Sequence, residues 1–241
     1  VKGVIIVSAG FREVGEEGAA IERALVSICN KAGIRGVGPN CLGVINPVPE
    51  IRLNASFSAR MPNHGKISFI SQSGALCTSV LDFAADRNFG FSKFISIGNK
   101  ADVDELDLLR YLHEDPNTEV IMIYLEELRR GPEFVETVKE ITGGYRRTPV
   151  LVIKSGRTLA GAQAAASHTG ALAGSEAVYD AIFKQSGIIR ADSIHALFDL
   201  ARAFAYKEET SLGKMRRTVP YGNGVATITN AGGPGIVATD M

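Results

Sequence analysis

His168 is the residue whose surroundings most clearly suggest chemistry, because it lies in a run of alanine, glycine, serine and threonine over residues 164–174. Small residues allow a loop to move and leave the imidazole accessible to a ligand. A neutral imidazole nitrogen is a nucleophile near pH 7, and histidine can carry a covalent intermediate. No second histidine lies near it in the sequence, so a metal site is not indicated. A loop histidine with only a local hydrogen bond is the alternative.

Two turns of small residues could bind an anion. In each, an apolar run is followed by small polar residues or glycines and then by a helical pattern, so the free amides and the dipole at the helix start could hold a phosphate. Pro234 suits the first position of the second helix. An ordinary helix N-cap is the alternative for either turn. The residues predicted to bind phosphate are Ser71, Gln72, Ser73, Gly74, Gly232, Gly233 and Gly235.

Two carboxylates, Glu126 and Glu127, directly follow the apolar run 120–125. Doubly wound sheets place their sites at the carboxyl ends of strands, so a carboxylate here could hold one ring nitrogen of His168 and leave the other free to attack. Strand alternation directs only one of the two into such a site. The alternative is a solvated pair beside Arg129 and Arg130.

A third loop, Gly38–Gly43, follows a short strand and contains Cys41. A cysteine in a loop could act as a nucleophile, but no base is paired with it. Buried, inert cysteine is the commoner situation.

The elements that must position these residues alternate along the chain. Apolar, strand-like runs occupy 4–7, 66–70, 93–97, 120–125, 150–154 and 225–229. Amphipathic, helical patterns occupy 16–32, 74–88, 103–114, 132–142, 174–186 and 193–206. Continuous apolar strands are typical of sheets covered on both faces, and this alternation predicts an α/β fold of doubly wound parallel sheets.

Five segments follow from this pattern. We expect the end of a Rossmann-like domain at 1–47, a linker rich in proline and glycine at 48–65, and a complete flavodoxin-like domain at 66–191. A helix and linker at 192–223 then lead to the start of a second flavodoxin-like domain at 224–241. The chain opens directly into an apolar run and stops where a helix should start, so we expect the first and last domains to be incomplete.

Composition narrows the possible partners. Lys plus Arg and Asp plus Glu both number 26, which offers no electrostatic basis for binding nucleic acid or an anionic membrane. No apolar run approaches the roughly 20 residues that span a bilayer, and no signal peptide opens the chain. The three cysteines lack metal-ligand spacing, and their pattern suits a reducing cytoplasm.

Taken together, these motifs resemble the NDP-forming acyl-CoA synthetases. The similarity is closest to the ADP-forming acetate/acyl-CoA ligases and more distant to the α subunit of succinyl-CoA synthetase. Six segments carry it in register along the whole chain. They are Ser8–Phe11, Gly38–Gly43, Ser71–Leu76, Glu126, Ser167–Gly174 and Asn230–Gly235.

The resemblance implies a role for each segment. His168 matches the histidine that carries the phosphoryl group between an acyl phosphate and ADP, and Glu126 matches the glutamate that steadies it. The two small-residue turns match helix starts that grip the phosphate from either side. The remaining positions match the coenzyme A and acyl region, and they are Ser8, Gly10, Phe11, Pro39, Asn40 and Cys41.

The resemblance also implies what must come from elsewhere. Coenzyme A and a carboxylic acid are the expected substrates, with ATP or ADP and Mg²⁺ held by an ATP-grasp domain or β subunit outside these residues. We expect the front half of the CoA-binding domain to lie outside these residues, and we expect an oligomer. Two other uses of the scaffold stay open: a CoA-binding regulatory module of a protein acetyltransferase, and a CoA-dependent lyase module.

Overall fold

The computed structural model describes residues 1–156, 176–205, 208–209, 215–216, 226, 228–230 and 232–239. Residues 1–205 form one compact unit and residues 206–241 a second, and each is taken by itself. His168 and the rest of Ser167–Gly174 lie outside the described residues.

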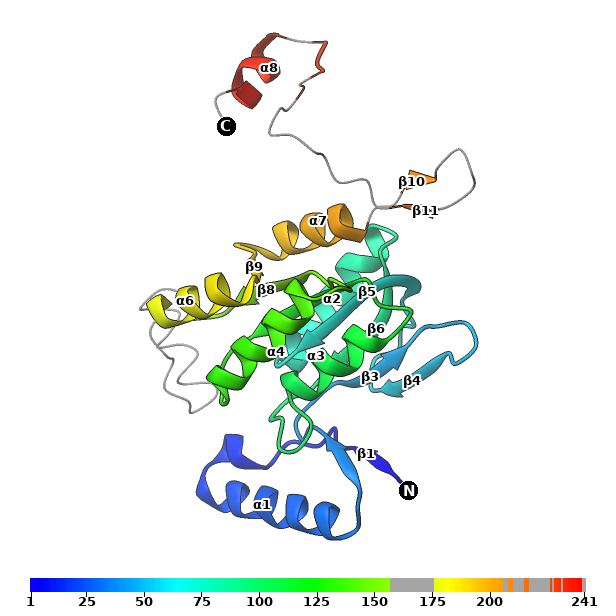
Figure 1. Cartoon of the computed structure of the whole chain (residues 1–241). Helices are drawn as coiled ribbons and strands as arrows, with labels where there is room; N and C mark the ends of the chain where they lie inside the picture. The colour runs from blue at the N-terminus through cyan, green and yellow to red at the C-terminus, as the bar shows by residue number, and fades with distance from the viewer. Residues whose placement is uncertain are drawn as a thin grey trace. The chain divides into compact units, whose positions relative to one another are not determined.

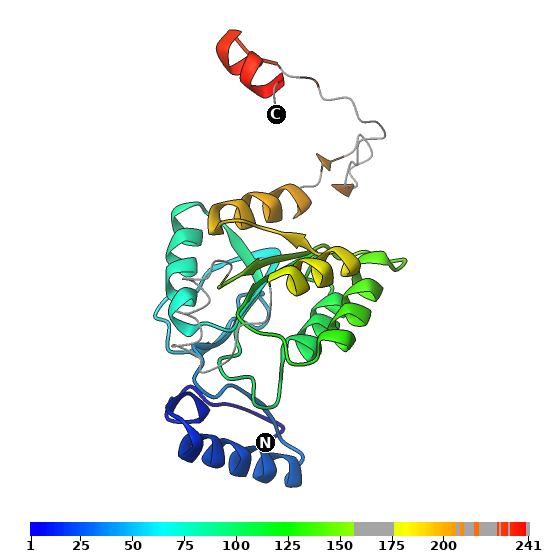
Figure 2. The same cartoon turned by 90° about the vertical axis from the view of Figure 1, so that its left-hand side faces the viewer.

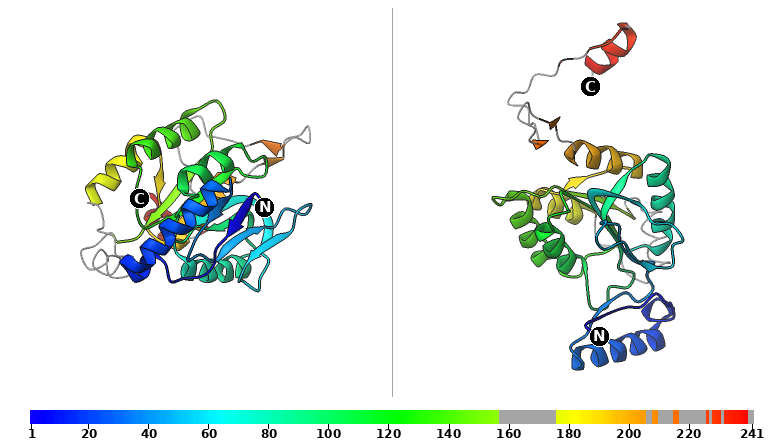
Figure 3. Two further views of the ribbon diagram at one scale, coloured as in Figure 1. Left: turned by 90° about the horizontal axis from the view of Figure 1, so that it is seen from below. Right: turned by 90° about the vertical axis from the view of Figure 1, so that its right-hand side faces the viewer.

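The first unit begins with a strand–helix–strand element. β1 (Gly3–Ile5) is followed by the 3-10 helix η1 (Arg12–Val14), the helix α1 (Glu16–Lys31) and β2 (Arg35–Val37). β1 and β2 pair in parallel in a two-stranded sheet. Figure 3 shows α1 running beside this pair. The predicted strand–helix–strand order is present, and its assignment to the end of a Rossmann-like domain stays a prediction.

A seven-stranded sheet follows, in the order β4-β3-β6-β5-β7-β8-β9. Its strands are β3 (Gly43–Asn46), β4 (Leu53–Ser56), β5 (Asn63–Ser71), β6 (Gly90–Ser96), β7 (Val120–Leu125), β8 (Val150–Lys154) and β9 (Ile189–Arg190). The strands from β6 to β9 in this order are mutually parallel. Counted along the chain from β5, their order is the flavodoxin-like 2-1-3-4-5.

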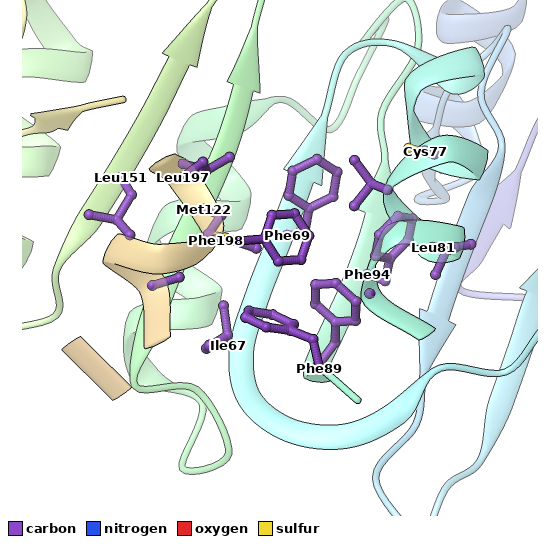
Figure 4. Close-up of a cluster of buried hydrophobic side chains, with 14 of the residues drawn as sticks. Ile67, Phe69, Cys77, Leu81, Phe89, Phe94, Met122, Leu151, Leu197 and Phe198 are labelled. Carbon is purple, nitrogen blue, oxygen red and sulfur yellow. The ribbon is translucent and has the colours of Figure 1, made fainter. Parts of the chain in front are cut away.

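Helices cover both faces of this sheet (Figures 1 and 2). They are α2 (Gly74–Asp86), α3 (Glu105–Glu114), α4 (Gly131–Gly143), α6 (Glu176–Ser186) and α7 (Ile194–Ala205). α2 and α7 supply one apolar cluster against the sheet, and α3, α4 and α6 supply the other. Figure 4 shows the first cluster, in which the rings of Phe69 and Phe94 lie 5.1 Å apart and those of Phe89 and Phe198 4.6 Å apart. The predicted doubly wound α/β class is confirmed.

Several boundaries differ from the expectation. The predicted linker at 48–65 contains β4 and the beginning of β5, and β3 lies in the seven-stranded sheet rather than with the first domain. β3 pairs antiparallel with both β4 and β6. The residues of β4 form no apolar run, so only this pairing makes them a strand. α7, placed after the sheet domain by the sequence, contributes Leu197 and Phe198 to its core.

Among its described residues, the second unit contains little secondary structure. β10 (Glu208–Glu209) pairs antiparallel with β11 (Met215–Arg216), and α8 spans Gly232–Thr239. Ala226, Ile228 and Thr229 are not in a strand, and the other two residues of the strand predicted at 225–229, Val225 and Thr227, lie outside the described residues. Within the described part of the chain, no helix is long and apolar enough to cross a membrane.

Candidate functional site

A cleft of about 1150 Å³ opens at the carboxyl edge of the parallel strands. Its walls come from the segment before α1, the loop before β3, the β5–α2 turn and the loops after β6 and β7. The chain leaves β5 toward β6 on one side and enters β7 on the other, so the cleft lies at the point where the winding of the sheet reverses. Open α/β sheets bind their ligands at this point.

The β5–α2 turn forms one wall. Ser71 Oγ accepts from the amide of Ser73 at 3.0 Å and donates to the carbonyl of Ser73 at 2.8 Å. Ser73 is the N-cap of α2, where its Oγ accepts from the amide of Leu76 at 3.3 Å. These bonds shape the turn, and Ser73 and Gly74 both line the cleft. Ser73 is therefore an N-cap, as the alternative interpretation held. The first backbone amides of α2 are still directed at the carboxyl edge of the sheet, where the cleft opens.

Gln72 links this turn to the end of β7. Its Oε1 accepts from the amides of Glu126 at 2.8 Å and Glu127 at 2.9 Å, and its Nε2 donates to the carbonyl of Glu127 at 3.0 Å. The side chain is buried. Its oxygen and its amide nitrogen thus both bind the protein's own backbone, and Gln72 also lines the cleft, so its predicted contact with phosphate stays a prediction.

Glu126 and Glu127 both line the cleft. Glu127 Oε1 lies 3.2 Å from Nε of Arg129 and 3.9 Å from a guanidinium nitrogen of Arg12. Burial, and then the charge of Glu126, raises the pKa of Tyr124. The expectation that only one of the two carboxylates points into a site stays a prediction.

The loop before β3 forms the opposite wall. Asn40 has a positive φ of 56°, and its amide donates to the carbonyl of Ser8 at 2.9 Å. Cys41 donates its Sγ–H to the carbonyl of Ile6 at 3.3 Å. Burial raises the pKa of the Cys41 thiol to about 11, so this residue is a neutral thiol near pH 7. The inert interpretation of Cys41 fits better than the nucleophilic one.

The Ser8–Phe11 segment is held next to this loop. Glu13 Oε1 accepts from the amides of Gly10 at 2.6 Å and Phe11 at 3.1 Å. One carboxylate therefore closes the turn that leads into η1. The neighbouring Ala9 and Arg12 line the cleft.

Asn99 connects these walls, and the sequence did not single it out. Its Nδ2 donates to Glu13 at 2.6 Å and to Glu22 at 2.8 Å, and its Oδ1 accepts from Asn40 at 3.2 Å. Arg12 donates to its carbonyl. The signal was present in the sequence, since this polar residue lies two positions after the apolar run 93–97, much as Glu126 lies one position after 120–125.

The structure brings one part of the predicted site together. The β5–α2 turn, Glu126 and the loop with Asn40 and Cys41 meet around the cleft. The segment with Gly232, Gly233 and Gly235 belongs to the second unit, and α8 begins at Gly232. Among the described residues, no group of three or more His, Cys, Asp or Glu side chains could hold a metal ion.

Comparison with known proteins agrees with this arrangement. Residues 64–204 match the family model of the succinyl-CoA ligase like flavodoxin domain. The 4-hydroxybutyrate–CoA ligase (ADP-forming) of Nitrosopumilus maritimus is 45% identical over 100% of this chain, which covers 33% of that relative. The α subunit of acetate–CoA ligase (ADP-forming) II of Pyrococcus furiosus is 44% identical over 100% of this chain and 49% of its own length.

A solved structure extends the likeness to three dimensions. It is the Ca. Korarchaeum cryptofilum dinucleotide forming acetyl-coenzyme A synthetase 1 in complex with phosphate and ADP, with a TM-score of 0.88 and 41% identity. The match covers 99% of this chain and 48% of that one. The chain thus spans about a third to a half of the length of these proteins. The resemblance noted in the sequence is confirmed, and the chain belongs to the family of the succinyl-CoA ligase like flavodoxin domain, alongside the ADP-forming acyl-CoA ligases.

Proposed function

We propose that this chain is the α-type part of an acyl-CoA synthetase that converts a carboxylic acid, coenzyme A and ATP into acyl-CoA, ADP and phosphate. The observation that carries the proposal is the single cleft at the carboxyl edge, into which the proposed phosphate turn, Glu126 and the proposed acyl loop all open. ADP-forming relatives aligned over the whole chain support it.

The proposed chemistry has three transfers. The γ-phosphoryl group of ATP moves to a nitrogen of His168, which releases ADP. A carboxylate oxygen of the acid then attacks the phosphorus, which frees the histidine and forms an acyl phosphate. Finally the sulfur of coenzyme A attacks the acyl carbon, loses its proton and expels inorganic phosphate. The histidine is thus a covalent carrier that divides one difficult exchange into easier ones.

Within this scheme, Glu126 steadies the imidazole of His168. The amides at the start of α2, with Ser71, Ser73 and Gly74, hold the phosphate, and a charged group there gains from amides that need no reorganisation. Gly232, Gly233 and Gly235, at the start of α8, are the second phosphate-binding group in the proposal. Ser8, Gly10, Phe11, Pro39, Asn40 and Cys41 contact coenzyme A and the acyl group.

The rest of the enzyme is part of the same proposal. ATP or ADP and its Mg²⁺ bind an ATP-grasp domain, either on the same polypeptide or on a β subunit, in an oligomer located in the cytoplasm. One relative is named for a subunit α, which favours such a division. The acid is proposed only as a class, since the relatives are named for different acids, 4-hydroxybutyrate and acetate.

Phosphoprotein formation tests the proposal. The intact enzyme, given γ-labelled ATP, should form an acid-labile and base-stable phosphoprotein, and His168→Ala should abolish the label. His64→Ala, in β5, is the matched control and should label as the wild type does. Glu126→Gln should slow labelling while coenzyme A still binds. A His168→Ala protein that labels as strongly as the wild type would show that the mechanism is wrong.

A further inference from the structure

Lys100 is a buried lysine at the cleft that the proposed chemistry does not use. It follows β6, is 3% exposed, and its Nζ donates to both carboxylate oxygens of Glu105, at 3.0 and 3.1 Å. The same Nζ also donates to the backbone carbonyl of Glu127 at 2.8 Å. An ammonium group has three N–H donors, so these three contacts account for its full capacity.

Gln72 reaches the same stretch of backbone from the other side. Its Nε2 donates to the carbonyl of Glu127, so this carbonyl accepts from Gln72 and from Lys100. Its Oε1 accepts from the amides of Glu126 and Glu127. Both peptide units that flank Glu126 are therefore held by one oxygen atom.

The backbone held in this way carries the carboxylate that the proposed mechanism needs. Glu126 follows β7 in a loop, where no sheet ladder fixes its backbone. Hydrogen bonds to both flanking peptides determine where its Cα–Cβ bond points. Since a misplacement of about 1 Å can reduce a rate about 100-fold, the orientation of this backbone matters for transfer.

We propose that Gln72 and Lys100 are positioning residues that hold the backbone of Glu126 in register with the phosphate turn. The inference rests on the proposed function and deepens it. It assigns the Gln72 side chain to the orientation of Glu126, and it assigns Lys100 a role besides its ion pair with Glu105.

Gln72→Met tests the first half, because methionine has a similar length and forms none of the three hydrogen bonds. In single-turnover labelling of the intact enzyme with γ-labelled ATP, the rate should fall about 10- to 100-fold. The KM for coenzyme A should stay within about twofold, since the residue acts on phosphoryl transfer. Gln72→Glu keeps an acceptor for the two amides and loses the donor, so its rate should lie between those of the wild type and Gln72→Met.

Lys100 needs a pair of variants, because Lys100→Met leaves the buried Glu105 carboxylate without its counter-ion and can prevent folding. Lys100→Met/Glu105→Gln removes that charge. The double variant should fold and still label about tenfold more slowly than wild type, and Glu105→Gln alone should label within about twofold of it. Circular dichroism and unfolding midpoints would establish that each variant is folded.

The outcomes separate the two proposals. If the wild type labels and Gln72→Met labels at the same rate, Gln72 does not position Glu126. If the double variant labels at the rate of Glu105→Gln, Lys100 only pairs with Glu105 and does not position Glu126. A wild type that forms no phosphoprotein would overturn the proposed function, and the positioning roles would fall with it.

Discussion

Two buried lysine–carboxylate pairs lie at opposite edges of the same sheet, and they differ in what else they hold. Lys93 Nζ lies 2.8 Å from Asp115, near the amino end of β7. Lys100 Nζ lies 3.0 Å from Glu105, at the carboxyl edge. All four side chains are at most 7% exposed. Both pairs therefore join a buried lysine to a buried carboxylate, and they differ in the other groups that each pair contacts.

In the pair at the amino edge, neighbouring donors also bind the carboxylate. Asp115 also accepts from the hydroxyl of Thr118 at 2.8 Å and from the amide of Asn117 at 3.2 Å. Burial acts to raise the pKa of Asp115, but the hydrogen bonds from Lys93 and Thr118 outweigh it, and the pKa is lowered. This carboxylate is well compensated as an anion.

The pair at the carboxyl edge is less well compensated. Burial raises the pKa of Glu105, and Lys100 only partly opposes that effect. Lys100 divides its donors between this carboxylate and the carbonyl of Glu127. The contrast teaches that Lys100, at the edge carrying the cleft, also holds a loop, whereas Lys93, at the other edge, donates to its carboxylate partner Asp115.

The largest effect should come from breaking the amino-edge pair. Lys93→Met leaves Asp115 buried without its cation, which should cost about 3–5 kcal/mol of stability. The midpoint of urea unfolding of the intact enzyme would report it. Because Lys93 does not line the cleft, the labelling rate of the folded fraction should match the wild type. A slowed rate in folded protein would contradict the division between the two edges.

Alanine substitutions at two glycines should have a smaller effect on stability, and they allow a direct comparison of the two edges. A Cβ on Gly98 would lie 2.2 Å from the carbonyl oxygens of Pro39 and Asn40, and φ there is +51°. A Cβ on Gly90, at the start of β6, would lie 2.4 Å from the carbonyl oxygen of His64. We expect each alanine variant to lose about 1–3 kcal/mol, Gly98→Ala through backbone strain and the close contact, and Gly90→Ala through the close contact alone.

The two glycine variants should differ in kinetics. Gly98→Ala displaces the Pro39–Asn40 loop, so it should raise the KM for coenzyme A several-fold, whereas Gly90→Ala should leave it unchanged. Steady-state kinetics of the intact enzyme would measure both. Equal KM values for the two variants would argue against a role of this loop in binding coenzyme A.

The smallest expected effect is a difference in how the contributions of Asp115 and Glu105 to stability depend on pH. Asp115 has a lowered pKa, so its contribution to stability is present above the ordinary carboxyl pKa of about 4 and is lost as the pH falls through the folded value. Glu105 has a raised pKa, so its contribution is present below that value and is lost as the pH rises. The stability cost of Asp115→Asn should therefore grow as the pH rises toward the ordinary carboxyl pKa of about 4, and the cost of Glu105→Gln should shrink as the pH rises beyond that value. Unfolding curves on both sides of that pH would show whether the two slopes have opposite signs.

How much of the fold and of the site could be predicted from the sequence depends on whether the signal for each element lies within that element. The buried parallel strands were predicted because helices on both faces make their sequences continuously apolar. β3 and β4 were missed because their strand character depends on pairing with β6 and with each other. The same limit applies to the site. Glu126 could be found from its place after a strand, but the bonds of Gln72 depend on the register of β5 against β7, which pairs Ser71 with Tyr124.

The antiparallel position of β3 has a consequence for the order of folding. β3 and β4 are close in sequence and can pair early, but the other partner of β3 is β6, where Val44 lies opposite Ile95. That partner is in place only after the β5–α2–β6 crossover has closed, and such distant contacts form slowly. The loop with Cys41 directly precedes β3, so it reaches the edge of the sheet with this late step. The cleft is therefore complete only when β3 has docked against β6, and a partly folded chain without that contact would lack it.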